Sequence, residues 1–176
     1  MSNSGSMLSA PLLPTGSAPA LGAVTFARRT VDLALAFEAE VEAVVLRRPL
    51  PPALRASAAA LLGAPATVRV VVEVGAAAAG LAATLGPGPL ADDVAAWAEC
   101  LAELTGAAAV GVRLERLAHA MCPRLHADRV LARVVCTYAG AGTELVARAQ
   151  VDAAHLGRPG TTDGDVLHPG ATLVQA

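Results

Sequence analysis

The apolar residues of this 176-residue chain are mostly small, and this limits its folds more than any other feature. Hydrophobic residues make up 55% of the sequence, but aromatic residues make up only 2%, namely Phe26, Phe37, Trp97 and Tyr138. A core must therefore be built from Val, Leu and Ala, and alanine buries little apolar area per residue. Length and apolar content together predict one domain with a core of modest stability.

The charge pattern argues against nucleic-acid and membrane partners. The formal net charge is −2, and neither sign is concentrated in one region. Phosphate-backbone binding requires a basic stripe, which the pairs Arg28-Arg29 and Arg47-Arg48 do not form; we interpret them as solvated edges. No stretch has the length of uninterrupted apolar sequence that a membrane span needs. We therefore expect a cytoplasmic protein that binds neither nucleic acid nor membrane.

Two further features set the expected domain organisation. The first 22 residues are rich in Ser, Pro and Gly, and they lack the basic start and apolar centre of a signal peptide. We expect a disordered tail over 1–22 and a single α+β domain over 23–176. The cysteines Cys100, Cys122 and Cys136 are odd in number and fit no C-x-x-C spacing, which favours thiols over disulfides.

Helices are predicted mainly in the first half of the chain. Residues 49–63 begin with prolines and end at a glycine, as helices often do. Residues 76–86 are predicted helical from their alanine content. The segment 90–106 carries Asp92 and Asp93 in its first turn, where the helix dipole favours carboxylates. Its apolar residues recur at three- and four-residue steps and predict one buried face, formed by Val94, Trp97, Leu101 and Leu104.

Strands are predicted mainly in the second half. A further short helix is predicted in the first half, beginning near residue 30. Runs rich in β-branched residues or with alternating polarity predict strands at about 42–48, 66–74, 108–119, 128–140 and 143–151, with a last short strand near the C-terminus. The run AGAG before the last of these ranges is expected to turn the chain into a paired strand. Helices followed by antiparallel strands predict an α+β fold.

His126 and Asp128 form the clearest candidate site. On a strand, residues two apart point to the same face. An imidazole and a carboxylate placed in this way are the first two ligands of a two-histidine, one-carboxylate metal site, whose open positions accept oxygen or substrate. The third ligand is a choice among His119, His155 and His168. We favour His168, because a returning strand would bring it back to the first two.

Neighbouring residues add candidates and an alternative. The H-x-D triplet is short, so a surface hydrogen-bonded pair is the competing interpretation. Arg124 and Arg133 are candidates for holding the anion of a small-molecule substrate. Cys122, Tyr138 and Glu144 are further candidates, although a carboxylate directly after a glycine turn is often just an exposed strand residue. The run GAGT lacks the Lys-Ser/Thr of a phosphate-binding loop.

The stretch 121–146, MCPRLHADRVLARVVCTYAGAGTELV, resembles the core of a bacterial family known as domain of unknown function 1826. The family pattern is close to C-P-R-F-H-x-D-x-V-x-x-R-L-x-x-T-Y-x-G-x-G-T-E-W. The matching residues are Cys122, Pro123, Arg124, His126, Asp128, Val130, Arg133, Thr137, Tyr138, Gly140, Gly142, Thr143 and Glu144. Leu125 and Leu145 replace the phenylalanine and tryptophan of the pattern. The resemblance covers most of residues 35–157.

The resemblance implies a metal, though not which one. The family is similar in its H-x-D to iron and 2-oxoglutarate oxygenases, which implies a partial double-stranded β-helix of the cupin type. Family members also tend to be encoded beside metallochaperone GTPases linked to zinc limitation. The family continues past GDV with a second histidine motif, which this chain replaces with LHPGATLVQA. We therefore expect a domain that is incomplete at its C-terminus relative to the family.

Three functions are compatible with these observations. The first is an oxygenase-like enzyme with a non-haem iron bound by the H-x-D site. The second is a non-catalytic accessory protein of zinc homeostasis with a metallochaperone as its partner, since zinc accepts the same nitrogen and oxygen ligands. The third is an inactive remnant or interaction domain. Loss of a closing strand would leave an open sheet edge and favour self-association.

Overall fold

The computed structural model describes residues 23–63, 67–119, 124–156 and 158–176. The predicted tail over 1–22 and the candidate ligand Cys122 lie outside these residues. The chain divides into two compact units. Of the described residues, those within 23–49, 124–126 and 142–176 form the terminal unit, and those within 50–119 and 127–141 form the central unit.

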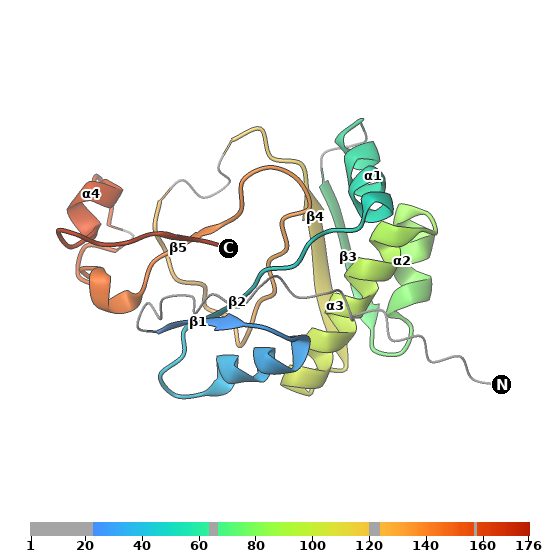
Figure 1. Ribbon diagram of the computed structural model, residues 1–176, viewed down its shortest axis with the longest axis horizontal. Coiled ribbons are helices and arrows are strands. Elements are labelled where there is room, and N and C mark those ends of the chain that lie inside the picture. Colours follow the sequence, from blue (N-terminus) through green and yellow to red (C-terminus); the bar gives the residue numbers. More distant parts are fainter. Residues whose placement is uncertain (1–22, 64–66, 120–123, 157) are drawn as a thin grey trace. The chain divides into compact units, whose positions relative to one another are not determined.

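The central unit contains the predicted helices and two of the predicted strands (Figure 1). Its elements are α1 (Pro52–Ala60), the 3-10 turn η2 (Leu61–Gly63), β3 (Thr67–Glu73), α2 (Ala77–Leu85), α3 (Pro89–Thr105) and β4 (Ala109–Glu115). Proline occupies the first turn of both α1 and α3, where a missing N–H costs nothing. Gly106 ends α3 in the left-handed conformation at φ 68°, which glycine adopts without strain.

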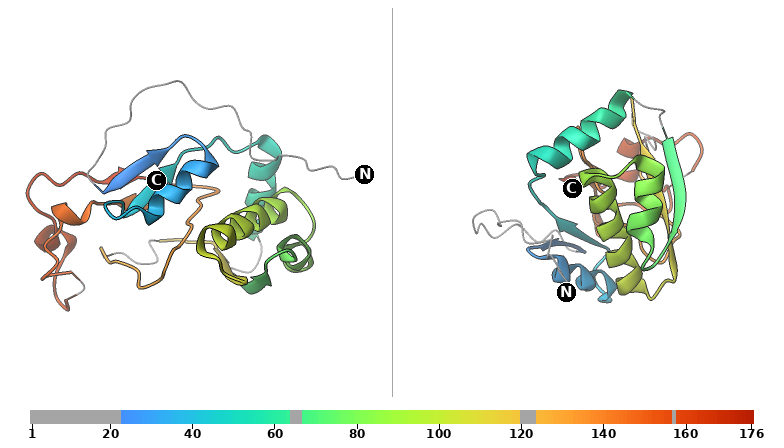
Figure 2. Two further views of the ribbon diagram at one scale, coloured as in Figure 1. Left: turned by 90° about the horizontal axis from the view of Figure 1, so that it is seen from below. Right: turned by 90° about the vertical axis from the view of Figure 1, so that its right-hand side faces the viewer.

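One face of a two-stranded sheet carries the core of the central unit. β3 and β4 pair antiparallel, and α2 and α3 lie along one side of them (Figures 1 and 2). Val72 and Val110 lie opposite each other in the register, and both are buried toward the helices. Leu81 of α2 is fully buried in the same cluster. Alternation in the strands therefore produces the predicted half-buried sheet.

The buried face of α3 differs from the prediction. Its buried residues are Leu90, Ala91, Val94, Ala95, Ala98 and Ala102. Trp97, Leu101 and Leu104 are only half-buried, so of the four predicted residues Val94 alone is buried. The alanine face turns inward because small side chains let α3 approach its neighbours closely. Of the larger residues, Leu101 then packs at the border of the core.

The terminal unit combines the first and last segments of the chain. Its elements are β1 (Val24–Ala27), the 3-10 helix η1 (Thr30–Phe37), β2 (Ala43–Leu46), β5 (Glu144–Leu145), the 3-10 turn η3 (Arg148–Gln150), α4 (Asp163–Val166) and β6 (Val174–Gln175). β1 and β2 pair in parallel, whereas β5 and β6 pair antiparallel. The helical start and the strand predicted near 30 and 42–48 are thereby confirmed.

Polar contacts join the early and late segments of the terminal unit. Arg148 binds Glu42 twice, through its backbone N–H at 3.0 Å and its Nε at 2.7 Å. The Nη2 of Arg47 donates to the backbone oxygen of Gln175 at 3.2 Å. A Cβ on Gly142 would overlap the backbone oxygen of Ala176. Only glycine fits at this position, because the residue that follows β6 packs directly against it.

The predicted strand over 128–140 is wrong. The chain bends at Val130 and Leu131, and residues 129–135 make no backbone–backbone hydrogen bond with any part of the chain that the structure describes. The expected return strand over 143–151 is reduced to β5, and its partner is β6 rather than the preceding segment. A segment of alternating polarity forms a strand only when a neighbouring strand accepts and donates its backbone hydrogen bonds. Within the part of the chain that the structure describes, residues 129–135 have no such neighbour.

The α+β class is confirmed, because the chain combines helices with small antiparallel sheets. The predicted order of helices first and strands second is wrong, since three strands precede α3. The partial double-stranded β-helix stays a prediction. Among the described residues, no helix combines the length and apolar character that crossing a membrane would require.

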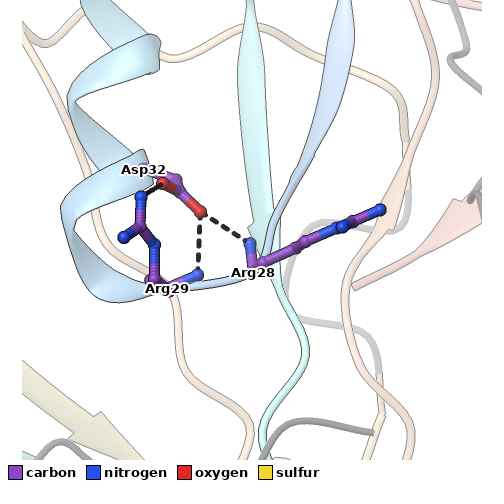
Figure 3. A network of polar contacts seen from close by, with 3 residues as sticks. All are labelled: Arg28, Arg29 and Asp32. Atoms are coloured by element: carbon purple, nitrogen blue, oxygen red, sulfur yellow. Dashed lines mark hydrogen bonds and ion pairs between the residues drawn. The ribbon is translucent and has the colours of Figure 1, made fainter. Parts of the chain in front are cut away.

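Asp32 organises the start of η1 (Figure 3). Its carboxylate accepts the backbone N–H groups of Arg29 at 2.9 Å and Arg28 at 3.0 Å, and it pairs with the Arg29 guanidinium at 3.3 Å. The backbone hydrogen bond from Arg29 is the main cause that lowers the pKa of Asp32 below its ordinary value, followed by that from Arg28. The predicted solvated pair Arg28-Arg29 is thus also the cap of a short helix.

Removal of the Leu81 side chain should be the most destabilising single truncation in the central unit. Leu81→Ala leaves a cavity at a position that is 0% exposed. We expect a loss of about 2–4 kcal/mol in the free energy of unfolding, measured by urea denaturation. Leu117→Ala is the control, because this leucine is 54% exposed and should cost less than about 0.5 kcal/mol. Equal effects of the two substitutions would contradict the assigned core.

The cap at Asp32 should make stability depend on acid pH. Because its folded-state pKa is lowered, its contribution is present above the unfolded-state pKa and is lost as the pH falls through the folded-state pKa. Asp32→Asn should therefore lower the melting temperature at neutral pH, and the difference from wild type should shrink toward low pH. A difference that stays constant across the acid range would show that the charge of the carboxylate plays no part.

Candidate functional site

The segment that carries His126 is tied to the loop and helix near the end of the chain. The backbone N–H of Leu125 donates to Oδ1 of Asp163 at 3.0 Å, in the first turn of α4. The Nη1 of Arg124 lies 3.5 Å from the backbone oxygen of Arg158. Arg124, predicted to hold a substrate anion, therefore contacts a neutral carbonyl, and its anion role stays a prediction.

The imidazole of His126 has a defined orientation. Its Nδ1 lies 3.0 Å from the backbone oxygen of Arg124, while the ring itself is exposed. A carbonyl oxygen can only accept a hydrogen bond, so Nδ1 must carry the proton. In the neutral ring the lone pair is then on Nε2. Metal-binding histidines are commonly oriented by this kind of hydrogen bond from the other ring nitrogen.

Asp128 belongs to the central unit, whereas His126 belongs to the terminal unit. The Oδ2 of Asp128 pairs with Nη1 of Arg133 at 2.8 Å, across the bend at residues 130 and 131. The Asp128 side chain is 36% exposed and that of Arg133 is 52% exposed. Arg133, predicted as an anion contact, thus has a carboxylate of the chain itself as its partner.

Tyr138 fixes the segment after Arg133 to the central unit. Its hydroxyl donates to Oδ2 of Asp93 at 2.7 Å, and its ring packs against the core of the central unit. Asp93 lies in α3. The sequence predicts for it only a favourable interaction with the helix dipole in the first turn. The contact with Tyr138 gives Asp93 a tertiary partner that no local pattern could reveal. It also accounts for Tyr138 structurally.

The other predicted residues lie on the terminal unit. Glu144 is exposed on β5, opposite Gln175 of β6. The backbone N–H of His168 donates to the backbone oxygen of Gln150 at 2.9 Å, next to the bridge between Val151 and Leu167, and His168 is exposed. Across the described ranges, no three His, Cys, Asp or Glu side chains come together as a metal-binding group.

His155, one of the three candidates for the third ligand, is a second oriented histidine, and its partner was not predicted. Nδ1 of His155 lies 2.7 Å from Oδ2 of Asp152. The hydrogen bond with His155 is the main cause that lowers the pKa of Asp152, followed by that with the Ala154 N–H and, more weakly, by the charge of His168. The three-residue step between Asp152 and His155 was the only signal in the sequence.

The described cysteines are not ligands of a cluster. Cys100 and Cys136 are half-buried and form no disulfide. Burial raises the pKa of the Cys100 thiol, with a smaller effect of the Glu103 charge. A raised pKa disfavours the thiolate, which is the form that reacts and binds metal. Cys100 therefore fits the interpretation of a packing residue.

Comparison with known sequences places the chain in a family. The family described as "Protein of unknown function (DUF1826)" matches residues 27–173, which include the segment around His126. The chain therefore belongs to this family, as the motif in residues 121–146 predicted. No curated protein matches the chain. No solved structure matches it either.

The hydrogen bond at His126 predicts which tautomer its imidazole adopts. When its imidazole is neutral, His126 should carry its proton on Nδ1, because that nitrogen donates to the carbonyl of Arg124. Long-range proton–nitrogen correlation spectra at pH 8 should show this tautomer for His126 and for His155. His119, which is exposed, should show the mixture typical of an unconstrained imidazole. Predominant Nε2 protonation of His126 would contradict the orientation described here.

Proposed function

We propose that the protein binds a divalent metal ion, iron or zinc, with His126 and Asp128 as ligands; His168 stays the predicted third ligand, which the described residues do not bring together with the first two. The observation that carries the proposal is the hydrogen bond between Nδ1 of His126 and the carbonyl oxygen of Arg124. It orients the ring and assigns the lone pair to Nε2, which is the state that a metal-ligating histidine requires.

The ion pair at Asp128 supports a ligand role for its carboxylate. A carboxylate has two oxygens with about four lone-pair positions, and the contact with Arg133 is made by Oδ2 at 2.8 Å. Metal-ligating carboxylates are usually held by a further hydrogen bond from the protein, and Arg133 supplies one. In this proposal Arg133 positions Asp128 rather than binding the substrate.

The donor set fits both candidate metals. One or two imidazole nitrogens and a carboxylate oxygen suit iron(II) in oxygenases as well as zinc. With iron, the bound metal would supply oxygen activation, and the protein would be an oxygenase-like enzyme acting on a small molecule held through Arg124. With zinc, the same residues would serve an accessory protein of zinc homeostasis, with a metallochaperone as its partner.

Metal content is the direct test. Protein purified without a chelator or histidine tag should contain iron or zinc, or should take it up after anaerobic reconstitution. His126→Ala and Asp128→Ala should each lower the affinity at least roughly tenfold, because every lost ligand removes a strong bond. Elemental analysis and metal titration measure both quantities. Oxygen consumption by the iron form, and none by the zinc form, would favour the oxygenase over the accessory protein.

His119→Ala is the matched control, since it removes another exposed imidazole. It should leave metal content unchanged, which guards against general histidine-driven adsorption. Arg133→Gln separates positioning from ligation, and it should weaken binding less than Asp128→Ala. Stoichiometric metal that survives both ligand substitutions would place the metal elsewhere. Failure of the wild type to bind either metal would overturn the proposal.

A further inference from the structure

The outer face of the β3–β4 sheet, opposite the helices, carries an unusual set of neighbours. In the antiparallel register Arg69 lies directly across from Arg113, and Val71 lies across from Gly111. These four residues share one face, because side chains alternate along each strand. They surround a shallow hollow of about 350 Å³ that is open to solvent and lined by Arg69, Val70, Val71, Gly111, Val112 and Arg113.

The facing arginines are electrostatically unfavourable within the sheet. Like charges directly opposite each other on one face destabilise a strand pair. The only carboxylate that contacts them among the described residues is Glu115, which binds Arg113 closely but lies 3.8 Å from Arg69. The side chains of Arg69 and Arg113 are 68% and 47% exposed, so both reach solvent. Two cations therefore share one close anion.

Gly111 is not required by the fold. It lies in the middle of β4 and its φ is not positive, so the backbone does not demand glycine. A Cβ added there would meet no heavy atom within 4 Å, so internal packing does not demand it either. Glycine within a strand costs stability, and it often marks a place where a ligand or another backbone approaches closely. The side chain missing here is what opens the hollow.

Val71 completes the floor of the hollow. It is 72% exposed, although it lies at the centre of β3. Together with the bare backbone of Gly111 it presents an apolar surface directly beside two guanidinium groups. Small-molecule sites commonly combine an apolar lining with a few polar groups that fix orientation. Arginine is suited to carboxylate and phosphate because its planar fork matches their geometry.

We infer that this face binds an organic anion, namely a carboxylate or phosphate attached to a flat apolar body. The anionic group lies between Arg69 and Arg113, and the apolar body lies over Val71 and Gly111. The site is formed within the central unit alone and does not depend on the proposed metal. Glu115 competes with the ligand for the same guanidinium groups, so it limits the affinity.

The test uses the full chain with benzoate and phenyl phosphate as probes, followed by calorimetry and amide chemical shifts. Both probes should bind saturably and shift the resonances of β3 and β4. Gly111→Val fills the hollow with a β-branched residue that strands favour, so it should fold at least as stably and yet bind roughly tenfold more weakly or worse. Glu115→Gln should bind about threefold more tightly, since it removes the competing charge.

Controls separate the two parts of the site. Inorganic phosphate should bind more weakly than phenyl phosphate, and neutral benzyl alcohol should not bind. Arg129→Gln removes an exposed arginine outside the sheet, and it should leave affinity unchanged. Folded Gly111→Val with wild-type affinity would overturn the inference, and so would the absence of saturable binding in wild type. Equal affinity for inorganic phosphate and phenyl phosphate would contradict the proposed contact between the apolar body of the ligand and Val71 and Gly111.

Discussion

Close packing of the alanine face of α3 against α2 and β4 is the contact on which the central unit depends. α3 turns Ala91, Ala95, Ala98 and Ala102 inward, and α2 and β4 lie against it. Each alanine buries little area, so the contact stabilises only because the backbones come close and leave few voids. This dependence explains why a chain with so few aromatic residues can form a core. Leu81, which is fully buried, is the largest side chain enclosed in this core.

The same packing leaves the other face of the sheet uncovered, which is why a binding surface can exist there. A sheet with helices on one side presents its alternate residues to solvent. On β3 and β4 these include two facing arginines and an unrequired glycine rather than a regular pattern of opposite charges. The residues that stabilise the fold and those of the inferred anion site therefore lie on opposite faces of the β3–β4 sheet. A substitution such as Gly111→Val can change one without damaging the other.

The family motif has a mixed structural meaning. Tyr138 and Gly142 are explained by contacts within the fold, through the bond to Asp93 and the close approach of Ala176. His126 and Asp128 differ, because both lie on the surface in segments without regular structure, and their contacts with the Arg124 carbonyl and with Arg133 orient exposed side chains. Exposed polar residues in ordered loops more often serve binding than packing. This contrast is what directs the functional proposal to His126 rather than to the whole motif.

The sequence by itself determined the helices of the central unit, the strands β3 and β4 and the membership of the family. Proline, glycine and periodicity act within a few residues, so they can be interpreted locally. Only the tertiary structure decided that 128–140 forms no strand, that β5 pairs with β6, and that Asp93 and Tyr138 meet. Those outcomes depend on partners distant in sequence. A hydrophobic pattern specifies which side of a strand is apolar, but it does not specify which partner completes its hydrogen bonds.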